Sequence, residues 1–336
     1  MAARYDFASD NVVGAMPEVM AALVEANAGA VSGYGADPVS ARAADLVREL
    51  VDADAEVRFT ASGTAANAFA LSVLAGAHEA VLCHEHSHVA TDEAGAPGFF
   101  SAGAGLILLP GAAGRIDPNR LGDLLAQPDV SYRQSPAALS LTNATEFGAV
   151  YAEPELEGLA RIAKGRGVKL HLDGARLSNA VAAGFDIKSL KRLGVDIAVL
   201  GGTKAGATPS EAVVFFDKSL ARRLDARLKH AGQLVSKARF LSAPWIGMLE
   251  TGAWVARAAH ANAMAKRLAG NMPFPLAHPV EANGVFVQMD DAALERLRRA
   301  GWFVYRFLDG SARFMCSWAT TPEAVDEIGA ALKAIA

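Results

Sequence analysis

Seven short apolar runs, each followed closely by small or polar residues, constrain the fold of this 336-residue chain more than any other feature. The runs are Val57–Thr60, Ala80–Cys83, Leu106–Leu109, Ala138–Leu141, Val168–Leu172, Ile197–Leu200 and Ala212–Phe216. Each has the length of a buried strand. Helical segments alternate with them: Pro154–Lys164 has helical spacing, and Asp117 with Pro118 is typical of a helix start. The alternation predicts right-handed βαβ crossovers and a mostly parallel sheet flanked by helices.

The pattern changes near residue 243. A long helix is expected from about Ala243 through Leu268, followed by a proline-rich loop and a strand, helix, strand, strand, helix series. We therefore predict an α/β fold with a large unit over residues 1–243 and a smaller C-terminal α/β unit over 244–336.

Composition narrows the function classes. Hydrophobic residues make up 52% of the chain and charged residues 20%, which favours a folded core over disorder. The net charge of −4 is spread without a basic patch, so neither nucleic acid nor a membrane is an expected partner. The two cysteines, Cys83 and Cys316, are too few for a disulfide framework, and we expect a reducing, cytoplasmic location.

Ligands of open α/β sheets gather at the carboxyl ends of the strands, so the residues after each run matter most. After Val57–Thr60 come Ser62, Gly63 and Thr64, where small residues precede a predicted helix start. The backbone N–H groups and positive end of that helix favour an anion such as phosphate. A simple helix cap is the structural alternative.

Two further strand ends carry charged residues. Asp173 follows Val168–Leu172, with Arg176 three residues later, so both could face one ligand. Carboxylates of this kind pair with the pyridinium nitrogen of pyridoxal phosphate (PLP), although a local Asp–Arg pair is the structural alternative.

Lys204 and Thr203 follow Ile197–Leu200 in the small-residue segment 201–206. Desolvation at such a position lowers the pKa of an amine and suits it to Schiff-base formation, whereas an exposed loop lysine is the alternative. Phosphate donors, a pyridinium partner and an imine-forming amine along one sheet edge together indicate PLP.

At these residues the sequence resembles the threonine aldolase family of fold-type I PLP enzymes, within the β-eliminating lyase superfamily. The resemblance spans nearly the whole chain and is strongest in these segments: Phe7-Ala8-Ser9-Asp10-Asn11, Tyr34-Gly35-Ala36-Asp37-Pro38, Ser62-Gly63-Thr64-Ala65-Ala66-Asn67, His88 with Glu93-Ala94-Gly95, Asp173-Gly174-Ala175-Arg176, Thr203-Lys204 and Ser236-Lys237-Ala238-Arg239-Phe240-Leu241. It is closest to the low-specificity threonine or phenylserine aldolase branch. The implied activity is PLP-dependent cleavage of β-hydroxy-α-amino acids, such as L-threonine, L-allo-threonine and L-phenylserine, to glycine and an aldehyde.

The resemblance also implies site residues. Catalytic roles fall to Lys204, His88 and Asp173. The cofactor contacts are Ser62, Gly63, Thr64, His88, Asp173, Arg176, Thr203, Lys204 and Arg239. The substrate contacts are Ser9, Tyr34, Arg176 and Arg313. Arg239 matches an arginine that reaches the phosphate from a neighbouring subunit, so a homo-oligomer, dimer or tetramer, with shared active sites is expected.

One segment departs from the family pattern. Many members carry a second active-site histidine in an Asn-Thr-His-Asn segment, where this chain reads Asn143-Ala144-Thr145-Glu146-Phe147-Gly148. The resemblance places His88 over the cofactor ring, and His88 or a positioned water is the predicted general base. The missing histidine leaves the base and the threo/erythro preference open.

Other chemistries compete with this interpretation. The segment His84-Glu85-His86-Ser87-His88 spells a zinc signature, which requires a helix to place His84 and His88 on one face. It follows an apolar run, so we predict a strand and turn there and no metal. A PLP-dependent β-elimination or transamination would use the same electron sink, and the fold alone does not separate these reactions.

Overall fold

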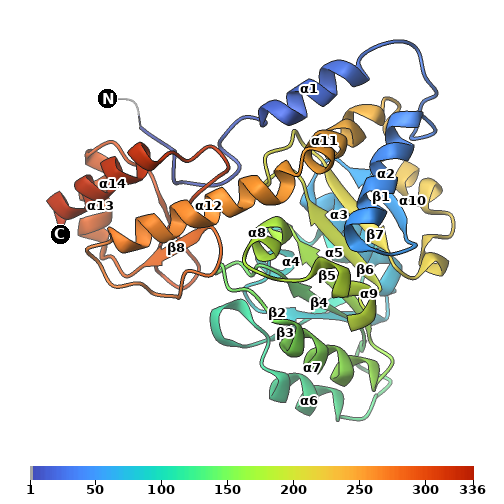
Figure 1. Cartoon of the computed structure of the whole chain (residues 1–336). Helices are drawn as coiled ribbons and strands as arrows, with labels where there is room; N and C mark the ends of the chain where they lie inside the picture. Colours follow the sequence, from blue (N-terminus) through green and yellow to red (C-terminus); the bar gives the residue numbers. More distant parts are fainter. Residues whose placement is uncertain (1–2) are drawn as a thin grey trace.

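The computed structural model describes residues 3–336, which form a seven-stranded sheet flanked by helices and a second, three-stranded sheet (Figure 1). The strands of the large sheet are β1 (Glu56–Thr60), β2 (Glu79–His84), β3 (Gly105–Leu109), β4 (Ser135–Thr142), β5 (Lys169–Gly174), β6 (Ile197–Gly201) and β7 (Glu211–Phe215). They lie in the order β1-β7-β6-β5-β4-β2-β3. The neighbours from β6 through β3 are parallel, and β7 is antiparallel to both β1 and β6. All seven apolar runs therefore lie on strands, and the predicted mostly parallel sheet is confirmed.

The helices of this unit flank both faces of the sheet, except that α1 packs on α11 (Figure 1). They are α1 (Pro17–Ala26), α2 (Pro38–Val51), α3 (Gly63–Leu74), α4 (His88–Thr91), α5 (Ala96–Phe100), α6 (Pro118–Leu125), α7 (Glu153–Lys164), α8 (Leu177–Ala182), α9 (Leu190–Leu193), α10 (Leu224–His230) and α11 (Arg239–Glu250). Strand β6 shows why both faces need cover: Ile197 and Val199 enter one hydrophobic core, and Ala198 and Leu200 enter another. The expected cap of α6 is present, because the Asp117 carboxylate accepts the N–H of Asn119 at 2.8 Å.

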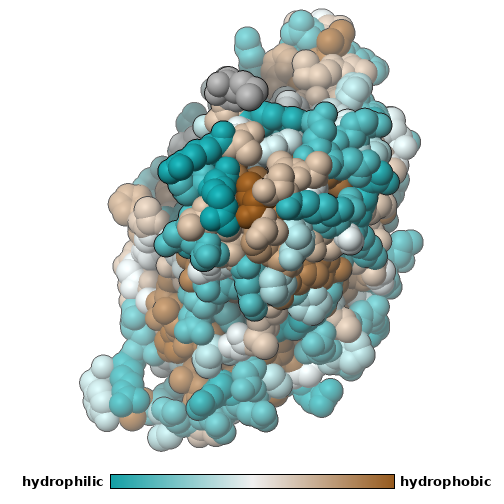
Figure 2. All heavy atoms as spheres, turned by 90° about the vertical axis from the view of Figure 1, so that its left-hand side faces the viewer, coloured by the Kyte–Doolittle hydropathy of each residue, from teal (hydrophilic) through white to brown (hydrophobic). Residues whose placement is uncertain are grey.

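The small unit has its own sheet and core. Its strands β8 (Gly284–Val287), β10 (Ala312–Met315) and β9 (Tyr305–Arg306) pair antiparallel in that order. They pack with α12 (Ala253–Gly270), α13 (Asp291–Arg299) and α14 (Pro322–Ile335). Figure 2 shows the left-hand side of Figure 1, where the small unit lies. On this face, hydrophilic residues cover most of the surface and hydrophobic residues form small groups between them. The strand and helix series predicted for this part of the chain is confirmed.

The start of the chain joins the small unit. Arg4 forms a bridge with Trp302, and Phe7 lies in the small unit's core. The division into residues 1–243 and 244–336 stays a prediction, and position 243 falls within α11.

The helix expected from Ala243 through Leu268 is wrong as a single element. It is two helices, α11 and α12, separated at Thr251 and Gly252. Gly252 adopts a left-handed φ of 71°, and the Thr251 hydroxyl donates to the carbonyl of Gly247 at 2.6 Å. These local features end α11 where hydrophobic periodicity alone indicated continuation.

Across residues 3–336, no helix combines the length and apolar character needed to span a membrane. Both cysteines are buried thiols outside any disulfide.

Candidate active site

A cavity of about 430 Å³ lies where the strand ends of the large sheet meet the small unit. It is lined by Ser9, Asn11, His88, Asp92, Glu146, Arg176, Lys204, Tyr305, Arg306, Phe307, Leu308 and Arg313. Five residues predicted from the sequence therefore meet here: Ser9, His88, Arg176, Lys204 and Arg313. Both units contribute, which is typical of a substrate site between domains.

Lys204 reaches the cavity from the turn after β6. That turn packs tightly against the end of β5, because a Cβ added at Gly201 would lie 2.2 Å from the carbonyl oxygen of Ala175. Burial lowers the pKa of the Lys204 amine, and the nearby charge of Arg176 lowers it further. A lowered pKa increases the neutral fraction of the amine, which is the form that attacks a carbonyl.

Asp173 lies at the carboxyl end of β5 and is only 3% exposed. Its Oδ1 accepts the backbone N–H of Ala175 at 2.9 Å, and its Oδ2 accepts the Asn67 amide at 2.8 Å. The carboxylate is thus fixed at the end of the strand, and its charge acts on Lys204. A rigid, buried carboxylate suits the protonated nitrogen of a pyridine ring.

A chain of hydrogen bonds joins Asp173 to His88. The Asn67 amide also donates to Oε1 of Glu93 at 2.9 Å, and this same oxygen lies 2.8 Å from Nδ1 of His88. The bond to Glu93 raises the pKa of His88, and burial raises the pKa of Glu93. The bonds fix the orientation of the His88 ring toward the cavity wall.

Arg176 is held by a buried partner that sequence reasoning missed. Its Nε and Nη2 donate to the two oxygens of Asp10 at 2.6 and 2.9 Å. Burial alone would raise the pKa of Asp10 and lower that of Arg176. The attraction between the two charges and their hydrogen bonds outweigh this effect, so the pKa of Asp10 is lowered and the pKa of Arg176 is raised. The predicted contact of Arg176 with the substrate stays a prediction, since two of its donors are engaged by Asp10.

Arg313 differs because its guanidinium is poorly satisfied. Among residues 3–336, its buried Nε has no hydrogen-bond partner, and its Nη2 lies 3.5 Å from the carbonyl oxygen of Ala8. The group sits 5.7 Å from the ring of Tyr305 and 5.0 Å from that of Phe307. Burial and the charge of Arg176 lower the pKa of Arg313. Such a guanidinium is poised to bind an anionic ligand.

The predicted phosphate residues lie at the start of α3. Ser62 caps the helix, with its hydroxyl accepting the N–H of Ala65 at 3.2 Å. A Cβ at Gly63 would meet nothing within 4 Å, so the approach to this helix end is open. The hydroxyl of Thr203, the residue before Lys204, accepts the N–H of Ser210 at 3.2 Å. Whether Ser62, Gly63, Thr64 and Thr203 bind the cofactor stays a prediction.

Two predicted residues lie outside this cavity. Tyr34 is 52% exposed, lines a separate cavity of about 300 Å³ and stacks with Lys229 at 5.0 Å. Arg239 begins α11 and donates to the carbonyls of Ala28 and Gly29 at 3.2 and 3.3 Å. Their predicted roles stay predictions, since neither residue lines the cavity that contains Lys204.

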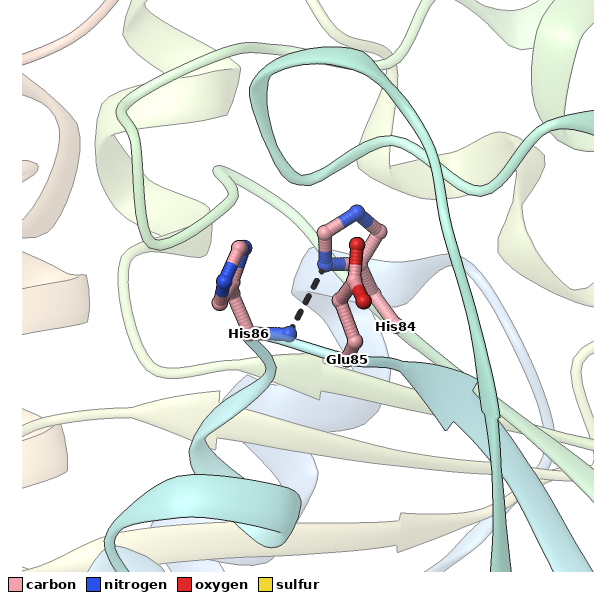
Figure 3. A group of neighbouring side chains, drawn as sticks. All are labelled: His84, Glu85 and His86. Carbon is pink, nitrogen blue, oxygen red and sulfur yellow. Dashed lines mark hydrogen bonds between the residues drawn. The ribbon is translucent and has the colours of Figure 1, made fainter. Parts of the chain in front are cut away.

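The zinc interpretation fails on local structure. Residues 84–87 are the end of β2 and a turn, as expected, and α4 begins only at His88, so His84 and His88 do not share the helix that a His-Glu-x-x-His site requires. Candidate ligand atoms of His84, Glu85 and His86 do lie within 4.8 Å of one another (Figure 3). However, Nδ1 of His84 accepts the N–H of His86 at 3.0 Å, and its Nε2 lies 3.1 Å from the carbonyl oxygen of Gly111. Both ring nitrogens are engaged, which leaves no lone pair for a metal.

Several site residues had no role in the sequence interpretation. They are Asp10, Asn67, Glu93, Glu146 and His171. His171 lies two residues before Asp173 and is 2.9 Å from the hydroxyl of Ser140. Burial lowers its pKa to about 4, so it is neutral near pH 7. Four of them, Asp10, Asn67, Glu93 and Glu146, lie inside segments quoted in the sequence analysis, and this position is the signal by which they could have been identified.

The arrangement fits PLP. It offers an amine with a lowered pKa, a fixed buried carboxylate on the neighbouring strand and an open helix end. Within the described part of the chain, buried atoms near these groups also lack partners, among them Oδ1 of Asn67 and Nε of Arg313. Native proteins rarely leave such atoms unsatisfied, so these atoms fit a site that binds a polar ligand.

Comparisons with known proteins agree with this geometry. A family model described as "Beta-eliminating lyase" matches residues 6–292. A low specificity L-threonine aldolase from a Pseudomonas species is 47% identical, over 98% of this chain and 97% of that protein. A low specificity L-threonine aldolase from Pseudomonas aeruginosa is also 47% identical, over 96% and 95%.

Solved structures of related enzymes also resemble this chain. A Leishmania major threonine aldolase superposes with a TM-score of 0.93 at 28% identity, covering 99% of this chain and 100% of that one. A Sphingomonas wittichii serine palmitoyltransferase, at 17% identity and a TM-score of 0.72, covers 99% and 86% and shares the fold. The predicted fold class, that of the fold-type I PLP enzymes, is confirmed. The chain belongs to the β-eliminating lyase family, in its threonine aldolase branch.

Proposed function

We propose that this chain is a PLP-dependent aldolase that cleaves β-hydroxy-α-amino acids to glycine and an aldehyde. One observation carries the proposal: Lys204 and Asp173 stand at the ends of neighbouring strands, and the cavity that Lys204 enters also contains the poorly satisfied guanidinium of Arg313. An amine, a ring-nitrogen partner and a carboxylate receptor are the parts that this reaction needs.

The residues that would hold the cofactor lie in this cavity and at strand and helix ends of the large sheet. Lys204 supplies the amine that bonds the cofactor, and Asp173 binds the ring nitrogen and favours its protonated form. Ser62, Gly63 and Thr64 bind the phosphate at the start of α3, assisted by Thr203 and by Arg239 of a neighbouring subunit. When bound, PLP accepts the electron pair left at Cα after a bond to that carbon breaks.

The substrate carboxylate binds Arg313, with Ser9 and Arg176 beside it. Arg313 is suited to this role because its Nε awaits a partner and bidentate geometry matches a carboxylate. A fixed carboxylate limits rotation about the bonds to Cα, which decides the bond that can break. His88 covers the face of the cofactor ring, oriented by Glu93.

We also propose a homo-oligomer, with a homotetramer as the expected form. Helix α1 supports this, because Met20 is 49% exposed and Val24 is 73% exposed. The positions of Tyr34 and Arg239 outside the cavity of their own chain fit sites completed by a second subunit. Two buried free thiols fit a reducing cytoplasm.

A product assay tests the function. The PLP-loaded protein is incubated with L-threonine, L-allo-threonine or L-phenylserine, without a keto acid. We expect glycine with acetaldehyde from the first two and glycine with benzaldehyde from the third. Ammonia with a keto acid would indicate β-elimination instead, and turnover only after a keto acid is added would indicate transamination.

A further inference from the structure

Glu146 lies in the loop after β4 and lines the same cavity as Lys204 and Arg313. Its Oε1 accepts two hydrogen bonds, from the backbone N–H of His88 at 2.8 Å and from the hydroxyl of Thr142 at 3.2 Å. Its Oε2 is buried and lacks a hydrogen-bond partner anywhere in residues 3–336. One oxygen thus anchors the side chain, and the other remains to meet a ligand.

The surroundings of Glu146 favour the neutral form of its carboxyl group and so raise its pKa. Burial, followed by the negative charge of Asp173, raises the pKa of Glu146 to about 7. A carboxyl with such a pKa accepts a proton far more readily than an ordinary glutamate, while a large fraction stays ionised at neutral pH.

His88 lines the same cavity, and its Nδ1 lies 2.8 Å from Oε1 of Glu93. This bond is the main cause of the raised pKa of His88. Glu146 differs from His88 because one of its oxygens, Oε2, is buried without a hydrogen-bond partner in the described part of the chain. A carboxylate oxygen in this position can accept the proton of a bound hydroxyl group.

We propose that Glu146 is the general base for the β-hydroxyl of the substrate, a role that rests on the proposed aldolase function. Oε2 of Glu146 takes the hydroxyl proton, and the O–H electron pair becomes the second bond of the aldehyde carbonyl. The Cα–Cβ bond breaks at the same time, and PLP, once the substrate amine has replaced Lys204 on it, would accept the electron pair of that bond. Cα then takes up a proton, which gives glycine.

The test compares Glu146→Gln with the wild type as PLP-loaded enzymes. Glutamine keeps the size of the side chain and an acceptor for His88 and Thr142, but does not act as a base. We expect cleavage of L-threonine to fall about 10²–10⁴-fold, the usual contribution of a general base. In the wild type, kcat should rise with pH through about 7 as Glu146 loses its proton, and this rise should be absent in Glu146→Gln. Glu146→Asp should still show the rise. Glu157 is an exposed carboxylate on α7, so Glu157→Gln should match the wild type.

Glycine separates a base from a structural residue. Exchange of its Cα proton in deuterium oxide needs the cofactor but no β-hydroxyl, so Glu146→Gln should exchange at nearly the wild-type rate. Infrared spectra of the cofactor-free protein, wild type minus Glu146→Gln, should show a carboxyl band that titrates near pH 7.

Three results would overturn this role. They are cleavage by Glu146→Gln at the wild-type rate and pH profile, an equal loss of cleavage and glycine exchange, or a carboxyl that titrates like an ordinary glutamate. A wild-type enzyme that releases no glycine from any of the β-hydroxy substrates would instead overturn the proposed function, and this role with it.

Discussion

Arg176 binds both carboxylate oxygens of Asp10, with Nε 2.6 Å from Oδ2 and Nη2 2.9 Å from Oδ1. The pair connects the N-terminal segment to the loop that follows β5, and Oδ2 of Asp10 also accepts the amide of Asn283 at 3.2 Å. Three distant parts of the chain are therefore joined at one edge of the active-site cavity. The position of Arg176, and of the loop that leads to it from Asp173, depends on Asp10.

Replacing Asp10 with Asn should destabilise the fold, because it leaves the guanidinium of Arg176 buried without an opposing charge. The side chains of Asp10 and Arg176 are only 1% and 11% exposed. Breaking a buried pair of this kind costs about 3–5 kcal/mol, which urea unfolding would measure. Asp326→Asn breaks the exposed pair with Arg267 and should change stability far less. Equal losses in the two variants would contradict this account.

Replacing Arg313 with Gln should weaken binding of the amino acid substrate. The guanidinium has a donor without a partner among the residues that the structure describes, and a charge-assisted hydrogen bond contributes about 1.5–3 kcal/mol. We therefore expect KM for L-threonine to rise roughly 10- to 100-fold in steady-state kinetics. Arg306 lines the same cavity but already binds Asp291 and the carbonyl of Met289, so Arg306→Gln is the matched control. An unchanged KM in Arg313→Gln would exclude Arg313 as the carboxylate receptor.

Replacing Glu93 with Gln should lower the pKa of His88. The hydrogen bond from Glu93 is the main cause of the raised pKa, so without the carboxylate the ring loses its proton at a lower pH. Proton NMR of the His88 ring across pH would show the midpoint moving down. Glu157→Gln should leave that midpoint in place. A midpoint that stays fixed or moves up in Glu93→Gln would mean that Glu93 does not control the charge of His88.

Replacing Gly201 with Ala should disturb the site by pushing β6 away from β5. The new methyl group would lie 2.2 Å from the carbonyl oxygen of Ala175, a backbone atom with little freedom to move. Overpacking of this kind costs about 1–3 kcal/mol, and it should also reduce covalent cofactor loading at Lys204. In contrast, Gly158 lies inside α7 with open space around it, so Gly158→Ala should stabilise the chain by about 0.5–1 kcal/mol. Equal thermal shifts in the two variants would count against the close packing.

The sequence predicted the sheet well because its signals are local. Each strand of the large sheet contains an apolar run, and β6 and β7 are buried along their whole length. Lys204 and Asp173 were identifiable because parallel strands bring the residues after them to one edge. The break at Gly252 was missed because a single left-handed residue ends a helix without changing the hydrophobic period around it.

Partners that are distant in the chain could not be predicted in the same way. Asp10 and Arg176 are 166 residues apart, and Glu146 contacts the backbone of His88 across 58 residues. Burial of Glu146 and the lack of a partner for Arg313 are properties of packing rather than of any motif. The sequence marked the segment of Glu146 as a departure from the family pattern, but not the chemistry that replaces the histidine.

Borohydride reduction of the PLP-loaded protein, followed by peptide mass mapping, identifies the lysine that bonds the cofactor. We expect the reduced cofactor to be attached to Lys204, and Lys204→Ala to retain no covalent label after the same treatment. Attachment to another lysine, or no attachment in a wild-type protein that still cleaves L-threonine, would contradict this expectation.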